Sequence, residues 1–203
     1  MSYPLVLPSN RQISSCRINA VDIVGTSISP FTGAQQVYAY TGQFWELDIN
    51  LRPMDREEAE QWITFFMKLR GAFGTFLMGD PNGATPRGVA TGSPLVNGGS
   101  QTGETLITDG WTAGVTGILK AGDYIQLGSA GTSRLYKVLD DVNSDGSGNA
   151  TLNIWPNLRS SPANNSAITV TNCKSIFRLS TANSWDIREA QIYGINFGAR
   201  EAL

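Results

Sequence analysis

The sequence predicts a mainly β protein: a β-sandwich that carries one amphipathic α-helix, with a small β-barrel-like domain inserted into it. Three observations support this fold class. Long polar/apolar alternations occur near both ends of the chain, only one segment has helical periodicity, and the composition shifts towards Gly, Ser, Thr and Asn from about residue 82. We therefore expect a discontinuous sandwich domain over residues 1–81 and 174–203, interrupted by a barrel domain over residues 82–173.

The first fifty residues have the pattern of short strands. Residues 17–24 and 44–52 alternate between polar and apolar side chains, and residues 36–41 are a further strand candidate. Residues 29–33, Ser-Pro-Phe-Thr-Gly, are typical of a turn. In residues 44–52 every second side chain is a large apolar one: Trp45, Leu47, Ile49 and Leu51. One face of this part of the sheet should therefore be buried and the other wet.

The single helix is expected over residues 55–70. Asp55 is a good N-cap with Glu58 three residues later, and Gly71 is a suitable left-handed stop. Acidic residues early and basic residues late match the helix dipole. The apolar residues recur at helical spacing: Ala59, Trp62, Ile63, Phe66 and Leu69. The stripe indicates a helix that covers a sheet.

The inserted region shows short strand candidates separated by turn signals such as Asp109-Gly110 and Asp145-Gly146. The candidates are residues 106–108, 123–127, 134–139, 150–155 and 168–170, the last of which should close the barrel. After the insert, residues 175–179 and 185–197 are expected to rejoin the first sheet, with Tyr193, Ile195 and Phe197 on one face.

Composition excludes several classes of function. The net charge is −2, charged residues make up 16% of the chain, and Lys and Arg form no block, so phosphate neutralisation does not supply affinity for nucleic acid. No apolar run approaches the length of a membrane helix, and the N-terminus has no secretory signal pattern, so production in a cytoplasm is expected.

The chain has no histidine. This excludes Ser-His-Asp and Cys-His catalysis and imidazole zinc sites, and it leaves carboxylate-only catalysis as the remaining hydrolytic design. Cys16 and Cys173 lie far apart in the sequence; free thiols are favoured for a reducing compartment, and a disulfide stays open as the alternative.

The residues most suggestive of a ligand site are Asp141, Asn143 and Asp145, which with Gly146 match the start of a calcium-loop pattern. The twelfth position, where the loop requires a bidentate Glu, is Leu152, and the neighbouring segments are strand candidates rather than helices. A polar β-hairpin turn explains the same residues and is the preferred interpretation. No cofactor and no resident metal are expected.

Three other candidates have plainer explanations. Residues 98–103, a Gly-rich stretch without a following Lys-Ser/Thr, are interpreted as a connection and not as a phosphate cradle. The carboxylates that could form a glycosidase pair lie mostly in turns: Glu104, Asp109, Asp123, Asp140 and Asp141. Four aromatics of the insert could stack on sugars, but a barrel core is favoured for them: Trp111, Tyr124, Tyr136 and Trp155.

Several segments follow one another along the chain in a characteristic series, beginning with residues 65–71 at the helix end, 74–81 and 86–90. Later segments extend the series over nearly the whole chain: residues 96–98, 108–111, 120–126 and 135–138. In sequence and order these segments resemble the tail proteins that long-tailed bacteriophages encode among their tail-tip genes, in particular the distal tail proteins.

This resemblance implies a β-sandwich ring domain with a helix and a second β domain that projects outward. It also implies a non-enzymatic hexameric ring that joins the tail tube protein to the baseplate hub, with possible contacts to tail fibres and with genomic DNA passing through the lumen unbound. The protein would then be located in the virion, at the tail tip. A carbohydrate-binding module for the host surface is the alternative function, and a carboxylate-based glycosidase is a third.

Overall fold

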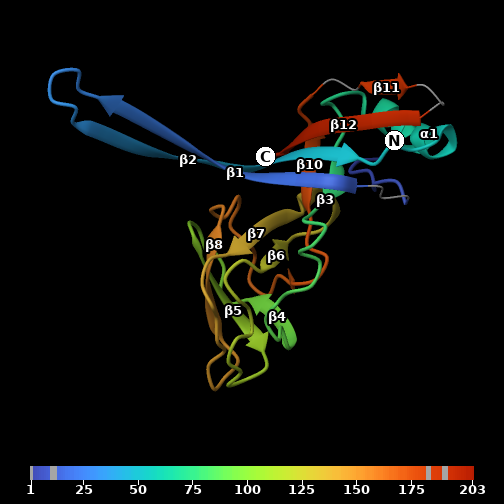
Figure 1. Ribbon diagram of the computed structural model, residues 1–203. Helices are drawn as coiled ribbons and strands as arrows, with labels where there is room; N and C mark the ends of the chain where they lie inside the picture. The colour runs from blue at the N-terminus through green and yellow to red at the C-terminus, as the bar shows by residue number, and fades with distance from the viewer. Residues whose placement is uncertain (1, 10–12, 182–183, 189–191) are drawn as a thin grey trace.

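The computed structural model describes residues 2–9, 13–181, 184–188 and 192–203. Two β bodies lie one beneath the other, and a long hairpin projects from the upper one (Figure 1). The upper body is a sandwich-like sheet with a helix on it, and the lower body is a nearly closed barrel. The predicted fold class, mainly β with one α-helix and a barrel-like part, is confirmed.

The projecting hairpin consists of β1 (Ile13–Ile28) and β2 (Gln35–Leu51), which pair antiparallel over almost their full length. The turn predicted at residues 29–33 is present: the Gly33 amide donates to the Ser29 carbonyl, and Gly33 has a left-handed φ of 70°. Residues 36–41, predicted as a separate strand, are instead the outer part of β2. The sequence analysis predicted two strands because Gly42 interrupts the polar/apolar alternation. In the structure a register shift between β1 and β2 lies at this point.

Helix α1 (Arg56–Leu69) begins where the capping pattern placed it, since the Asp55 side chain accepts a hydrogen bond of 2.9 Å from the Glu58 amide. The predicted stripe is buried, and Phe65 joins it. The left-handed stop starts one residue earlier than predicted: Arg70 has φ 54°, and Gly71 follows with φ 67°.

The main sheet has the order β1-β2-β12-β10-β3. The remaining strands are β3 (Phe76–Met78), β10 (Ser175–Leu179) and β12 (Ile192–Glu201). Residues 185–197, predicted as one run, comprise β11 (Trp185–Arg188) and the first half of β12, which pair with each other. Residues 189–191, which join the two strands in the sequence, fall outside the described residues.

One face of the main sheet is buried from Trp45 to the end of β2. Near the end of β2, α1 covers it, with the Phe66 ring 5.0 Å from that of Phe197. Further along the same face the barrel covers it at Trp45. The opposite face carries exposed or half-exposed polar residues such as Asp48, Asn50 and Arg200, as the alternation in β2 predicts.

The barrel has the order β4-β5-β8-β7-β6-β9. Its strands are β4 (Gly92–Val96), β5 (Thr105–Trp111), β6 (Tyr124–Leu127), β7 (Arg134–Val138), β8 (Ala150–Trp155) and β9 (Ile168–Thr169), with a short 3-10 turn at Ala130–Thr132. β9 closes the barrel as expected, because the Val96 amide donates to the Ser166 carbonyl across the seam. The sequence analysis did not predict β4, which lies in the Gly-rich region after residue 82 and before the connection at residues 98–103.

The chain leaves the main sheet after β3 and returns to it at β10, and these two strands pair with each other through Phe76 and Phe177. All barrel strands lie between Gly92 and Thr169, inside the predicted insert. An excursion whose two ends are hydrogen-bonded neighbours leaves the parent sheet unbroken (Figure 1).

The exit and return segments touch at Gly79, where a Cβ atom would lie 1.9 Å from the Cys173 carbonyl oxygen. We expect Gly79→Ala to lower the free energy of unfolding by about 1–3 kcal/mol, because backbone has to move to relieve the overlap. Urea denaturation measures the change. Gly146→Ala is the control: nothing lies within 4 Å of its Cβ position, so its effect should stay within about 0.5 kcal/mol. Equal stability of the two variants would contradict the steric argument.

Candidate functional site: a projecting hairpin and the groove at its base

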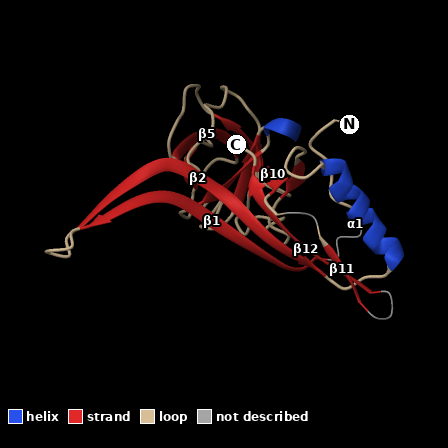
Figure 2. Ribbon diagram, turned by 90° about the horizontal axis from the view of Figure 1, so that it is seen from above, coloured by secondary structure: helices blue, strands red, loops and turns tan. Residues whose placement is uncertain are grey.

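The outer half of the hairpin, residues 23–42, is here called the arm. It extends beyond both β bodies, and neither the helix nor the barrel covers it (Figures 1 and 2). Its large apolar side chains are open to solvent: Ile23, Val24, Ile28, Phe31, Val37, Tyr38 and Tyr40. Phe31, in the turn at the tip, is 95% exposed. Contiguous exposed apolar surface of this kind marks an interaction site.

Both faces of the arm carry apolar side chains. Val37 pairs with Thr26 on one face, and Tyr38 pairs with Gly25 on the other. No Asp, Glu, Lys or Arg occurs between Ile23 and Trp45. Over residues 35–43, β2 pairs only with β1 among the described residues, and β1 is itself an edge strand. Two unprotected strand edges without charged residues are a template for pairing with another chain.

The base of the arm is fixed by a register shift in β1–β2. Asp22 pairs with Gln43 but Val24 pairs with Ala39, so β2 has three residues where β1 has one. The Tyr40 ring lies over Gly25, where a Cβ would be 3.1 Å away. A bulge of this kind increases the local twist and directs the arm away from the sheet.

The barrel is attached to the main sheet through Trp45. Its ring meets Trp155 edge to face with centroids 4.4 Å apart, and its Nε1 donates to the Leu135 carbonyl at 3.0 Å. Trp155 in turn donates from Nε1 to Asp22 Oδ1 at 3.0 Å. Buried aromatic packing with satisfied N–H groups fixes the barrel relative to the base of the arm.

A buried ion pair reinforces this junction. Arg159 donates to Glu201 Oε2 at 2.7 Å, and the Glu201 side chain is fully buried. The same carboxylate accepts from the Ser175 hydroxyl at 2.9 Å and from the Trp45 amide at 3.3 Å. Removing one partner would leave a buried charge unpaired, so the pair orients the barrel on the sheet.

Between the β1 face and the barrel lies an open groove of about 620 Å³, here called the junction groove. Its lining residues are Cys16, Ile18, Ala20, Asp22, Trp45, Asp80, Asn82, Tyr124, Lys137, Leu139 and Trp155. Burial raises the pKa of the Cys16 thiol to about 11, with smaller contributions from Asp80 and Asp48. Burial likewise raises the pKa of the Tyr124 hydroxyl, so both groups are neutral at physiological pH.

The four aromatics considered as sugar platforms divide into two pairs. Trp111 and Tyr136 are buried in the barrel core, where Trp111 Nε1 donates to the Thr108 hydroxyl and the Tyr136 hydroxyl accepts from the Arg159 amide. Tyr124 and Trp155 instead line the junction groove. Tyr124 is nevertheless 5% exposed and packs in the core under the main sheet, so of the four aromatics only Trp155 is partly open to solvent.

Three of the carboxylates considered for catalysis bind neighbouring polar groups. Asp123 accepts from the amides of Arg87, Gly88 and Lys120, and Asp140 accepts from the Asn153 side chain. Asp141 accepts from the Ala121 amide. Glu104 is exposed, and Asp109 is half-buried in β5. The Gly-rich residues 98–103 form a loop held by the Gln101 side chain, which bonds to backbone groups of Asn97, Gly98 and Ile107.

The calcium-like motif is a set of backbone acceptors. The Asn143 Oδ1 atom accepts from the Gly117 amide at 2.7 Å, and Asp145 Oδ1 accepts from the Ser147 and Asn149 amides at 2.8 Å. Among the described residues, no group of three or more potential metal ligands gathers at one point. These contacts agree with a polar turn between β7 and β8, in which the side-chain oxygens of Asn143 and Asp145 bind neighbouring amide groups.

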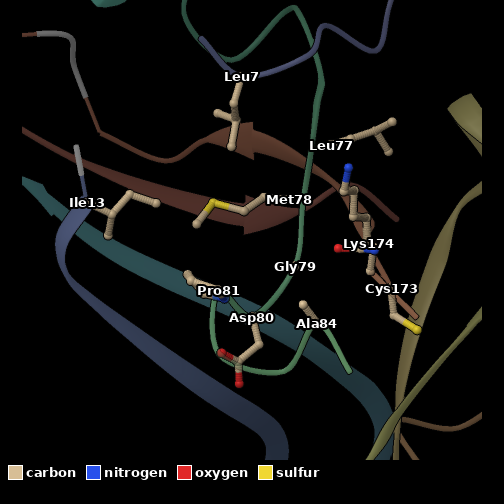
Figure 3. A pocket seen from close by; sticks show the side chains of 11 residues that line it. Leu7, Ile13, Leu77, Met78, Gly79, Asp80, Pro81, Ala84, Cys173 and Lys174 are labelled. Atoms are coloured by element: carbon tan, nitrogen blue, oxygen red, sulfur yellow. The ribbon is translucent and has the colours of Figure 1, made fainter. Parts of the chain in front are cut away.

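A small cavity of about 70 Å³ lies between the N-terminal segment, the start of β1 and the loop after β3 (Figure 3). Leu7, Ile13 and Met78 form its apolar side, and Asp80 and Lys174 lie at its margin. The volume is well below the roughly 300 Å³ at which small-molecule sites begin. It holds a few water molecules at most.

No protein-family model matches the chain, and no curated protein has significant sequence similarity to it. In the described part of the chain, no helix is long and apolar enough to cross a membrane. Both cysteines are free thiols, Cys173 buried and Cys16 half-buried.

Sequence reasoning missed both features of this site. The arm has a sequence signal, the absence of charge over residues 23–45 together with apolar residues of both parities. The groove has no sequence signal, because its lining residues come from segments that are distant in the sequence.

Asp123 supports the start of the insert, and its removal should have a defined pH dependence. Burial raises the pKa of this carboxyl, but three amide hydrogen bonds and the Arg87 guanidinium outweigh burial and hold it below its ordinary value. Asp123→Asn should lower the free energy of unfolding at pH 7 by about 1–3 kcal/mol. The difference should persist down to about pH 4, the ordinary carboxyl pKa, and shrink below it as the native carboxylate becomes protonated.

Urea denaturation at several pH values measures this difference. Asp186→Asn, in the exposed part of β11, is the control and should leave stability unchanged at every pH. A difference for Asp123→Asn that grows on acidification would contradict the account.

Calcium should not stabilise the protein. Because the oxygens of Asp141, Asn143 and Asp145 already accept backbone hydrogen bonds, a millimolar excess of calcium chloride should leave the thermal midpoint where an equal ionic strength of sodium chloride leaves it. A ligand at a hundred times its Kd would add about 2.7 kcal/mol. Calcium-specific stabilisation that Asp145→Ala abolishes would overturn this interpretation.

Proposed function

We propose that this protein is a non-enzymatic structural component of a bacteriophage tail tip, a distal tail protein that forms a hexameric ring. The observation that carries the proposal is the arm. A two-stranded hairpin is marginally stable in water by itself, yet this one extends without covering layers and exposes Val24, Val37 and Tyr38. A second protein surface must therefore cover it in the functional state.

The simplest candidate for the surface that covers the arm is another copy of the same chain. The arm projects from one end of the main sheet, whereas α1 lies at the other end (Figure 2). An arm that packs on a different surface of the next copy makes a heterologous contact, and such a contact closes into a ring when the rotation between copies is constant. The low charge density of the chain favours close packing of copies.

The resemblance to tail-tip proteins gives the ring its location and partners. It implies a virion protein that joins the tail tube protein to the baseplate hub, with the barrel turned outward towards tail fibres. Genomic DNA would pass through the lumen without specific binding, in agreement with a net charge of −2 and the absence of a basic block.

The absence of histidine and the engagement of Asp123, Asp140 and Asp141 in local hydrogen bonds support a non-catalytic role. None of these three carboxylates lines the junction groove, whose lining combines aromatic and charged side chains.

Charged substitutions on the arm should dissociate the ring into monomers. Val37→Lys combined with Tyr38→Glu places one charge on each face of the arm, at positions that are 60% and 52% exposed. Because neither side chain belongs to the core, the folded chain should persist by circular dichroism. Native mass spectrometry should show six copies for the unsubstituted protein and monomers for the variant, since burying an unpaired charge in an interface is costly.

Ile187→Lys, on exposed β11, is the matched control and should keep the ring. An unsubstituted protein that is monomeric at every concentration and absent from purified virions would refute the proposal. So would a charged-arm variant that still assembles.

A further inference from the structure

We propose that the junction groove binds a carbohydrate, one or two pyranose units of a surface glycan. This inference is independent of the ring: it concerns the side of the hairpin that faces the barrel, at the base of the arm. It rests on the combination of aromatic surface, fixed polar groups and size that the groove brings together.

Aromatic side chains form the end of the groove nearest the arm. Trp155 is half-buried, and its ring is fixed by the edge-to-face contact with Trp45 and by the hydrogen bond from Nε1 to Asp22. Tyr124 and Trp45 are 5% and 3% exposed, with ring centroids 6.2 Å apart, so they support Trp155, whose ring is the aromatic surface open to a ligand. A rigid aromatic platform with a polar rim suits the apolar face and hydroxyl edge of a sugar ring.

Polar groups of both signs surround this platform. Asp22 uses Oδ1 to accept from Trp155 and Gln43, and no hydrogen bond to its Oδ2 is present among the described residues. Lys137 donates to the Tyr124 hydroxyl at 3.0 Å and lies 4.5 Å from the centroid of that ring.

The segment after β3 adds a carboxylate and an amide to the lining. Asp80 accepts from the Asn82 amide through Oδ1, and the Asn82 side chain is exposed on the groove wall. Carboxylates accept from hydroxyls, ammonium groups donate to them, and amides do both, so the four groups together match a polyhydroxylated ligand.

The size and shape of the groove favour a sugar over a peptide. A volume of about 620 Å³ falls within the roughly 300–1,000 Å³ of small-molecule sites. The β1 wall consists of side chains of one face, Cys16, Ile18, Ala20 and Asp22. An extended peptide that adds to a sheet would instead use the backbone groups of the edge. The groove is open, so a longer glycan chain can continue out of it.

The test uses the full chain and saturation-transfer-difference NMR with the methyl glycosides of glucose, galactose, N-acetylglucosamine and rhamnose and with a β-1,4-linked N-acetylglucosamine trimer. We expect at least one of them to bind with a Kd of about 1 mM or tighter. Ala20→Trp fills the groove from β1 and should abolish binding. Asn19→Trp, one residue away on the opposite face of the same strand, is the matched control and should retain it.

Asp22→Asn keeps the acceptor for Trp155 and removes the charge, so it should weaken binding by about fivefold to tenfold even if Ala20→Trp fails to fold. Native mass spectrometry of the same samples records the ring separately. A panel without any binding sugar, equal binding by the unsubstituted protein and Ala20→Trp, or unchanged affinity in Asp22→Asn would each overturn the carbohydrate proposal. None of these results would alter the case for the ring, and a monomer that binds sugar through this groove would refute the ring alone.

Discussion

The continuous pairing of β1 with β2 is the constraint on which the rest of the structure depends. At its inner end the hairpin presents Leu47 and Ile49 to α1, and Trp45 to the barrel. At its outer end the same two strands continue without anything to pack against. The same two strands therefore contact α1 and the barrel at their inner end and form the arm at their outer end. The register shift after Asp22 marks the boundary between the two parts.

A buried network of polar groups holds the junction between the main sheet and the barrel. Glu201 is fully buried, and its carboxylate joins Arg159 of the barrel side to Ser175 and Trp45 of the main sheet. An apolar contact could slide, whereas a buried carboxylate that requires three specific donors permits one orientation. This rigidity keeps the junction groove open between its two walls and fixes its position relative to the arm.

Elements with local signals were predictable from the sequence. The helix followed from the Asp55 cap and its apolar stripe, and most barrel strands followed from alternation between turn residues. The length of the hairpin was not predictable, because Gly25 and Gly42 interrupt the pattern at the point where Tyr40 and Ile23 pack over them. β4 was missed since its residues resemble a loop, and only pairing with β5 makes them a strand. Neither groove wall has a local signature, because Trp45 and Trp155 meet only in the folded chain.

Hydrogen–deuterium exchange on the arm tests the central claim most directly, because it reports on whether another chain covers these strands. Within an isolated hairpin, the outward-facing amides of residues 24–28 and 35–40 have no partner and exchange freely. The account predicts that in the assembled protein these amides are protected as strongly as those of β5 and β8 in the barrel, and that dilution to monomers releases them. Outward-facing arm amides that exchange at the rate of an unstructured peptide in the particle would contradict it.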